Sequence, residues 1–260
     1  MASKYWILGI LGGAFGYTTV FAGDMGPIAT DRTSFRPVIA ILGGASWFRV
    51  STSQSFLNEN EDSFTYNNKG DPRADGFMGG FLGVEHDLWR SGVFADVGVE
   101  YDYYSPVTQK GLNAAGVQPN TDTLYQYQYR YQTQQVLAVG KLFGTVYDRF
   151  HPYISGGVGA AFNQLNSYQA FTEETGNRNL TPTFLNHHQT VFSYQLGIGV
   201  DTHLNQHLRL GLGYRFSWFD RVSLGSGTVT FANYSAPVPF TPSAQNITAN
   251  QFVAQLSYVI

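Results

Sequence analysis

Acidic and basic side chains recur at alternate positions within several apolar stretches of this sequence. The candidate set is Asp96, Glu100, Asp102, Asp201, Arg209 and Arg215, with Glu85 and Lys141 as further members. Side chains two positions apart on a strand point to the same face, so these acids and arginines can meet inside a β-structure. Because a buried charge without a partner is costly, we expect Glu100 or Asp102 to pair with Arg215. The pattern predicts a network of paired charges with a structural role.

A second group of residues raises the question of hydrolytic chemistry. His187 and His188 precede Ser193, and a histidine base beside a serine nucleophile is the pairing that acyl transfer uses. Their spacing does not select that chemistry, and no acidic side chain can be assigned to orient the histidine. Adjacent histidines at the end of a loop are more often solvent-facing polar residues. We therefore expect no catalytic residues, and a lipid-modifying enzyme is the weaker alternative.

Metal, cofactor and nucleic-acid sites are not expected. His203 and His207 are four residues apart without helical context, and the acids in residues 58–62 lack the ordered spacing of a calcium loop. No nucleotide-binding or zinc-protease motif is present, and the chain has no cysteine. The net charge of −3 leaves no basic surface for nucleic acid.

The elements that position these residues are apolar-alternating segments. We predict eight strands, at residues 38–50, 77–88, 93–104, 125–144, 152–165, 189–204, 208–224 and 250–260. Connections of a few residues alternate with connections of about 20 or more. The fold class that this alternation favours is all-β, an eight-stranded antiparallel transmembrane up-and-down β-barrel with short periplasmic turns and four long surface loops. The mean hydropathy of −0.16 agrees with this fold, because apolar outward and polar inward residues cancel along each strand.

The amino-terminal residues have the pattern of a secretory signal peptide. Lys4 precedes an uncharged stretch that ends at Ala22, and cleavage is expected after Ala22. The predicted organisation is a signal peptide at residues 1–22, a periplasmic stretch at 23–36 and the barrel at 37–260. A membrane anchor is the alternative, but the apolar run is short and contains several glycines.

The final segment alternates between an apolar and a mixed face. Phe252, Leu256, Tyr258 and Ile260 share the apolar face, which is predicted to contact lipid. Aromatic side chains near the long loops, at Tyr101, Tyr103, Tyr214, Phe216 and Trp218, fit an interfacial belt. The facing of the first and fourth strands stays open, because Trp47 and Phe48 are adjacent and the tyrosines of 125–131 are out of phase with Val136. A bulge, or a strand that continues above the membrane, would explain the fourth strand.

The sequence resembles the opacity-protein and OmpA/OmpX-like group of small Gram-negative outer-membrane barrels. The resemblance rests on the signal peptide, the alternation of short and long loops, the alternating last strand, and glycine-rich strands such as residues 153–162 and 210–216. The resemblance covers nearly the whole mature chain. It implies outer-membrane lipids, the barrel-assembly machinery and periplasmic chaperones as partners, with the last strand as the assembly signal. This sequence departs from the group at Ile260, where the group usually has Phe or Trp.

The predicted function is that of a non-enzymatic surface or structural protein without a cofactor. An eight-stranded barrel is only wide enough for side chains to fill it, so the charged residues are expected to plug the lumen. The long loops, rich in polar residues with scattered aromatics, could bind host surface molecules or glycans. The alternatives are a narrow, porin-like channel for small solutes and a secreted soluble β protein.

Overall fold

The structure is a computed structural model that describes residues 35–51, 53–57, 63–68, 74–89, 92–116, 123–147, 149–172, 182–231 and 234–260. Every regular element among these residues is a β-strand, and every strand pair is antiparallel. The all-β antiparallel class is therefore confirmed. The described residues contain no helix with the length and apolar character needed to cross a membrane. The predicted signal peptide and its cleavage at Ala22 lie outside the described residues.

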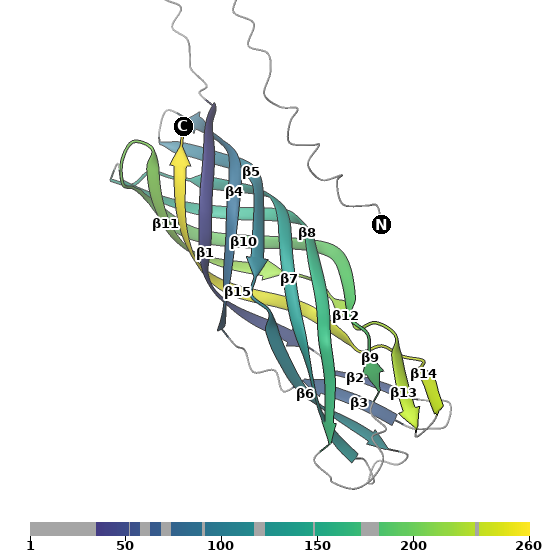
Figure 1. The fold of residues 1–260 in the computed structure, drawn as a ribbon. Helices are drawn as coiled ribbons and strands as arrows, with labels where there is room; N and C mark the ends of the chain where they lie inside the picture. Colours follow the sequence, from purple (N-terminus) through teal and green to yellow (C-terminus); the bar gives the residue numbers. More distant parts are fainter. Residues whose placement is uncertain are drawn as a thin grey trace, which may run out of the picture. The chain divides into compact units, whose positions relative to one another are not determined.

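Eight of the strands form a closed series of pairs, which we call the strand cycle; Figure 1 shows their arrangement. They are β1 (Phe35–Ser51), β4 (Ala74–Trp89), β5 (Val93–Tyr104), β7 (Thr123–Phe143), β8 (Phe150–Thr172), β10 (His187–His203), β11 (Leu208–Trp218) and β15 (Ser243–Val259). Each strand pairs with the next one in this order, and β15 also pairs with β1. Each predicted segment overlaps one strand of the cycle. The first strand begins at Phe35, inside the stretch predicted to be periplasmic.

The seventh and eighth strands differ from their predicted bounds. β11 ends at Trp218, because the chain turns inward at Phe219, and Asp220 follows with a φ of 55°. The Phe219 N–H donates to the Ile247 carbonyl at 2.8 Å. A short strand, β12 (Val222–Ser223), then pairs with β15, which extends β15 back to Ser243.

The predicted long loops contain further strands. These strands are β2 (Ser53–Leu57), β3 (Ser63–Asn68), β6 (Val107–Gly116), β9 (Thr183–Phe184), β13 (Gly227–Phe231) and β14 (Tyr234–Val238). β2, β3 and β6 extend the sheet beside β7, whereas β14, β13 and β9 form a separate three-stranded sheet. Inward and outward residues still alternate in these strands, but many of the outward residues are polar. A search for strands by alternating apolar residues therefore does not find them.

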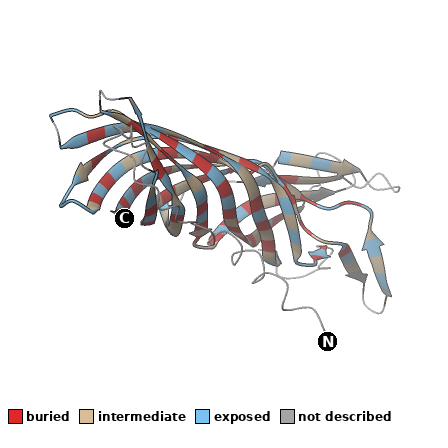
Figure 2. Cartoon of the chain, turned by 90° about the horizontal axis from the view of Figure 1, so that it is seen from above, coloured by how far each residue is buried: buried red, intermediate tan, exposed pale blue. Residues whose placement is uncertain are grey.

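Burial alternates along the strands of the cycle, as the red and pale blue bands of Figure 2 show. In β7 the alternation runs unbroken from Tyr125 to Phe143, with the tyrosines and Leu137 inward and Val136 outward. In β1, Ala40, Leu42 and Phe48 face inward, while Trp47 faces outward. The open question of the first and fourth strands is thereby answered, and Trp47 and Phe48 lie on opposite faces.

The bulge suspected in the fourth strand lies in its partner instead. The register between β7 and β8 shifts at Gln128 and Arg130, where β8 contains an additional residue at Ser167 with a φ of 53°. Beyond Ser167 the inward positions of β8 change parity, so Tyr168 turns inward and packs against Tyr127 and Phe184. A bulge of this kind redirects side chains without ending the strand.

The two ends of the strand cycle differ in their connections. The ends of β4, β7 and β10 that lead into β5, β8 and β11 lie at the same end of the cycle as Phe35 and Ile260, whereas β2, β3, β6, β9, β13 and β14 lie at the other end (Figure 1). The Ile260 N–H donates to the Pro37 carbonyl at 2.9 Å, which ties the last residue to the start of β1.

Candidate functional site: the interior of the strand cycle

The interior of the strand cycle collects all the charged residues singled out from the sequence. Asp96, Glu100, Asp102, Asp201, Arg209 and Arg215 are each at most 5% exposed. They come from β5, β10 and β11, whose period-2 alternation turns these positions inward. Glu85 and Lys141 are buried with them. The charges divide into two clusters, one toward each end of the cycle.

The first cluster is built on Arg215. Its guanidinium lies 2.5 Å from Glu100 Oε1 and 3.0 Å from Asp102 Oδ2. Its Nε donates to Gln251 Oε1 at 2.5 Å, and Gln195 donates to Glu100 Oε1 at 2.9 Å. One guanidinium thus binds both carboxylates that the sequence offered as alternative partners.

The second cluster is built on Arg209. Its guanidinium contacts Glu85 at 2.6 Å and Asp96 at 3.4 Å. The rings of Phe94 and Phe143 stack 4.6 Å apart, and the guanidinium carbon lies 5.3 Å from the centre of each. Arg215 has a similar contact with Phe77 at 4.9 Å. A cation over an aromatic face is stabilised by the ring quadrupole, so each arginine has both ionic and aromatic partners.

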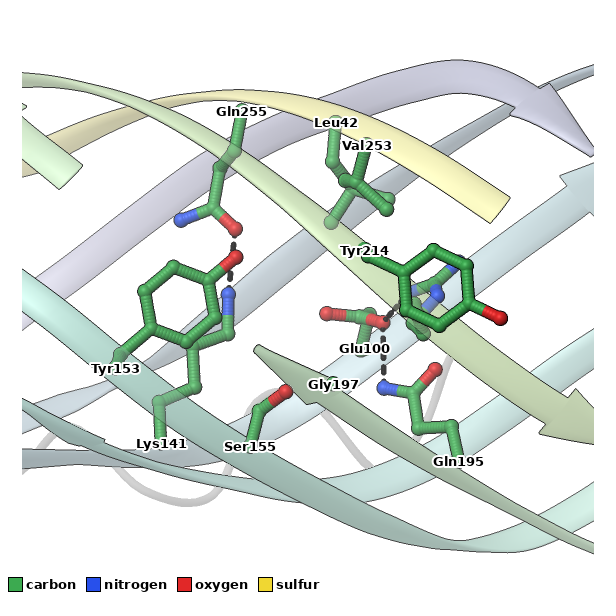
Figure 3. Close-up of a pocket in the computed structure, with 11 residues that line it drawn as sticks. Leu42, Glu100, Lys141, Tyr153, Ser155, Gln195, Gly197, Tyr214, Val253 and Gln255 are labelled. Carbon is green, nitrogen blue, oxygen red and sulfur yellow. Dashed lines mark hydrogen bonds and ion pairs between the residues drawn. The ribbon is translucent and has the colours of Figure 1, made fainter. Parts of the chain in front are cut away.

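Lys141 lies between the two clusters. Its Nζ donates to Gln255 Oε1 at 2.5 Å and lies 5.1 Å from the centre of the Phe81 ring. Figure 3 shows Lys141 and Gln255 on one side of a small cavity and Glu100 with Gln195 on the other. The cavity volume is about 20 Å³, which is room for roughly one water molecule.

Asp201 is a buried acid that forms no ion pair with Arg209 or Arg215. Neither of its carboxylate oxygens has a hydrogen-bond partner among the described residues. It lies beside Gly211, where an added Cβ would be 2.2 Å from Asp201 Oδ1. The absence of a side chain at Gly211 is what admits the buried carboxylate of the neighbouring strand. No group of three or more His, Cys, Asp or Glu residues in the described ranges could hold a metal ion.

Ser193 and the neighbouring histidines are held apart. Ser193 is fully buried, accepts a hydrogen bond from Gln135 at 2.5 Å and donates to the Trp218 carbonyl at 2.5 Å. His188 occupies an outward, exposed position of β10, five residues away on an extended strand, which corresponds to about 16 Å. Opposite faces and this separation exclude a direct Ser193–His188 pair in this arrangement.

A layer of aromatic rings lies beyond the Arg215 cluster, toward the end that carries β2 and β3. It consists of Phe48, Tyr104, Tyr131 and Phe219, which we call the aromatic layer. Phe219 lies 5.2 Å from Tyr104 and 5.6 Å from Phe48 between ring centres. Asn163 Nδ2 donates to the Phe219 carbonyl at 2.7 Å and so holds the inward turn. The layer covers the charged interior at this end.

A family model described as the outer membrane protein beta-barrel domain matches residues 13–259 of the chain. The chain belongs to this family. It is an outer-membrane protein of a Gram-negative bacterium, and membrane lipids surround it. Among curated proteins, none matches the sequence.

Several solved structures of outer-membrane proteins are similar to this family member at low sequence identity. OprG from Pseudomonas aeruginosa has 14% identity and a TM-score of 0.42, with 87% of this chain and 97% of OprG covered. The outer membrane protease OmpT from Escherichia coli has 10% identity and a TM-score of 0.46, with coverages of 88% and 99%. Neisserial surface protein A has 11% identity and a TM-score of 0.39, with coverages of 85% and 96%.

The outward face of this outer-membrane β-barrel protein is apolar. Exposed aliphatic residues include Ile39, Ile41, Leu82, Val97, Val99, Leu142, Ile154, Val158, Leu196, Ile198 and Leu212. The predicted face of the last strand is part of this surface, with Phe252 and Ile260 about 60% exposed and Leu256 and Tyr258 also outward. An apolar exterior around a charged interior is the distribution that a hydrocarbon solvent selects.

Several residues of the interior were not recognised from the sequence. Gln195 binds Glu100 and Gln251 binds Arg215, while Gln135 and Asn163 bind uncharged groups of the aromatic layer and its surroundings. Uncharged amides carry no distinctive signal in the sequence beyond their inward parity. Phe219 lies just past the end of β11, where strand periodicity no longer applies. Its role could not be predicted without the inward turn at Asp220.

Proposed function

We propose that the strand cycle is an eight-stranded transmembrane barrel with a closed lumen, and that the protein is a non-enzymatic surface or structural component of the outer membrane. The connections at 90–92, 144–149 and 204–207 are the periplasmic turns, and the four longer connections face the cell exterior. The observation that carries this proposal is the filled interior, where paired charges and the aromatic layer occupy the space inside the strands.

The change in composition along the outward face of β7 supports this placement in the membrane. Val136 and Leu142 are outward and apolar, whereas Gln134, Gln132 and Arg130 follow on the same face. The boundary is marked by tyrosines of β5, because Tyr101 donates to Gln134 at 3.0 Å and Gln132 donates to Tyr103 at 3.1 Å. Tyrosines with an apolar ring and a hydrogen-bonded hydroxyl are typical of a membrane interface. β7 therefore continues beyond the lipid.

Other aromatic residues complete this boundary around the barrel. Trp47 contacts Phe252 with ring centres 5.6 Å apart, and Phe252 contacts Tyr214 at 6.0 Å. Tyr194 stacks on Trp218 at 5.4 Å. We call these residues, with Tyr101 and Tyr103, the aromatic belt. The belt lies at the end with the longer connections and supports a membrane interface at that level.

The packing of the lumen favours a closed barrel over a narrow channel. The cavity beside Lys141 has room for about one water molecule, and Arg215 and Arg209 span the interior to reach acids on β4 and β5. The aromatic layer covers the outer end. A solute could pass only after the ion pairs and the aromatic layer had separated.

The extracellular strands have an aromatic core of their own, which supports a role in presenting a surface. Phe240 stacks on Phe56 with ring centres 4.3 Å apart and contacts Phe64 at 5.2 Å. The Gln54 carboxamide donates a hydrogen bond to Ser243 Oγ and accepts one from the Ser243 N–H at 2.9 Å. These two hydrogen bonds connect β2 to β15 of the cycle. These contacts hold the extracellular strands in place. Such a surface suits recognition of host molecules or glycans, because the protein loses little conformational entropy when it binds.

The proposed assembly route uses the last strand. The outward residues Phe252, Leu256, Tyr258 and Ile260 form the stretch that the barrel-assembly machinery would recognise after periplasmic chaperones deliver the chain. The pairing of β15 with β1 joins the last strand of the cycle to the first and so closes it.

Membrane fractionation tests the proposal directly. We expect the protein to stay in the membrane pellet after extraction with carbonate or urea, and to enter the detergent phase. On gels, the unheated protein should migrate differently from the heated protein, because a closed barrel keeps its strand pairs in cold detergent. Release into the carbonate supernatant, with identical migration before and after heating, would instead support a secreted soluble protein.

A further inference from the structure

A closed ring of five aromatic side chains lies inside the strands beyond the aromatic layer. Neighbouring ring centres are 5.0–6.3 Å apart. The members come from β3, β7, β8, β9 and the segment before β15, and we call them the outer cage: Tyr66, Tyr127, Tyr168, Phe184 and Phe240. Along β7, Tyr127 is four positions beyond Tyr131 of the aromatic layer, a rise of about 13 Å. The outer cage therefore belongs to the part of the molecule that we place outside the membrane.

Several polar groups of the outer cage are buried without hydrogen bonds. The Tyr66 hydroxyl faces Tyr168 and Asn113. Even so, the hydroxyls of all three cage tyrosines and both side-chain polar atoms of Asn113 lack a partner with hydrogen-bond geometry among the described residues. Tyr66 and Asn113 are fully buried, whereas both tyrosine hydroxyls of the aromatic layer are hydrogen-bonded. Because an unsatisfied buried polar group is costly, the outer cage has the character of a site for a hydrogen-bonding ligand.

The lining of the outer cage is neutral. Among the described residues, no charged side chain is buried on β2, β3, β6 or β9, or in the segments around Tyr127, Tyr168 and Phe240. Hydroxyl and carboxamide groups each donate and accept hydrogen bonds, and aromatic rings offer large apolar faces. A pyranose has the complementary groups, with hydroxyls at its edge and C–H groups on its faces. A neutral sugar therefore fits this lining better than an ion or a purely apolar molecule.

Phe240 closes the outer cage. Its ring stacks on Phe56 with centres 4.3 Å apart and an interplanar angle of 9°, and it is 9% exposed. It lies in residues 239–242, between β14 and β15, where Pro239 and Pro242 have no N–H to donate to a strand. The cavity beside the cage tyrosines has a volume of about 10 Å³, which is too small for a sugar ring. A sugar can therefore enter only when Phe240 leaves its place on Phe56.

We infer that the outer cage is a binding site for a neutral sugar ring and that residues 239–242 form its lid. The sugar takes the place of the Phe240 ring on Phe56, and its hydroxyls reach the hydroxyls of Tyr66 and Tyr168 and the carboxamide of Asn113. The strands around the site stay in place, because β3 pairs with β2 and β6, and β7 pairs with β8. This inference deepens the proposed recognition function, and access from the cell exterior rests on the proposed orientation of the barrel.

Calorimetric titration of the protein folded in a neutral detergent tests the site. The probes are the neutral sugars maltotriose, chitotriose and lactose, with sialyllactose as the carboxylate-bearing counterpart of lactose. We expect at least one neutral sugar to bind, and sialyllactose to bind no more tightly than lactose. Tyr66→Phe should raise the dissociation constant roughly threefold to tenfold, because one hydrogen bond is lost. Phe240→Ala should lower it roughly threefold or more, because the closed state no longer competes with the sugar.

Tyr101→Phe is the matched control, because it removes a hydroxyl from the aromatic belt, and it should bind like the unaltered protein. The site would be overturned if no neutral sugar bound to either the unaltered protein or Phe240→Ala, if sialyllactose bound more tightly than lactose, or if Tyr66→Phe and Tyr101→Phe bound equally. An unchanged or raised dissociation constant in Phe240→Ala would overturn the lid. Heat-modifiable migration of each variant without sugar is recorded separately, so failure of the barrel is distinguished from failure of this site.

Discussion

Replacement of Arg215 by leucine is expected to lower the free energy of unfolding by about 3–5 kcal/mol. The substitution removes the cation that contacts Glu100 at 2.5 Å and Asp102 at 3.0 Å, and leaves two buried carboxylates without a counter-charge. It also removes the contact between the guanidinium and the Phe77 ring. Urea unfolding of the protein refolded in detergent micelles, followed by tryptophan fluorescence, measures the loss.

Arg221→Leu is the matched control, because Arg221 is exposed and carries the same charge. It should change the stability by less than about 0.5 kcal/mol. Adding Glu100→Gln and Asp102→Asn to Arg215→Leu should recover part of the loss, because the buried carboxylates are then neutral. Equal stability of the Arg215 and Arg221 variants would show that the buried ion pairs are not needed to hold the lumen together.

Replacement of Phe219 by alanine is expected to cost a similar amount, about 3–5 kcal/mol, because a fully buried ring is lost from the aromatic layer. Phe48 and Tyr104 would lose their shared contact, and the cover over the charged lumen would be opened. The same urea titration measures this effect, and the slope of the transition shows whether the folded state stays compact.

Phe171→Ala is the comparison for this variant. Phe171 is 49% exposed on the outward face of β8, so the same truncation should have an effect below about 1 kcal/mol. If both phenylalanine variants unfold at the same urea concentration, then Phe219 does not anchor the inward turn after β11.

The sequence predicted the parts of this fold where apolar and polar residues alternate with high contrast. In β5 and β11 the alternation placed Glu100, Asp102 and Arg215 on inward positions, and the structure brings them together. Whether Arg215 pairs with Glu100 or with Asp102 could not be predicted from the sequence, because β5 and β11 are not neighbours and their relative position depends on how the whole cycle closes.

The remaining features could not be predicted, for identifiable physical reasons. Trp47 and Phe48 are both aromatic, and hydrophobicity alone does not distinguish a ring in the belt from a ring that fills the lumen. β2, β3 and β6 lie beyond the lipid, where outward residues are polar and the alternation loses contrast. The parity of β8 changes at Ser167, whose positive φ of 53° is a property of the folded backbone. Phe219 acts through a turn, where period 2 gives no information.

Single-channel recording across a planar lipid bilayer tests the closed lumen most directly. The unaltered protein, refolded and shown by heat-modifiable migration to be inserted, should give no large, stable conductance steps, because ion pairs and the aromatic layer fill the interior. Reproducible steps of large conductance from the same preparation would contradict the closed lumen and identify the protein as a channel.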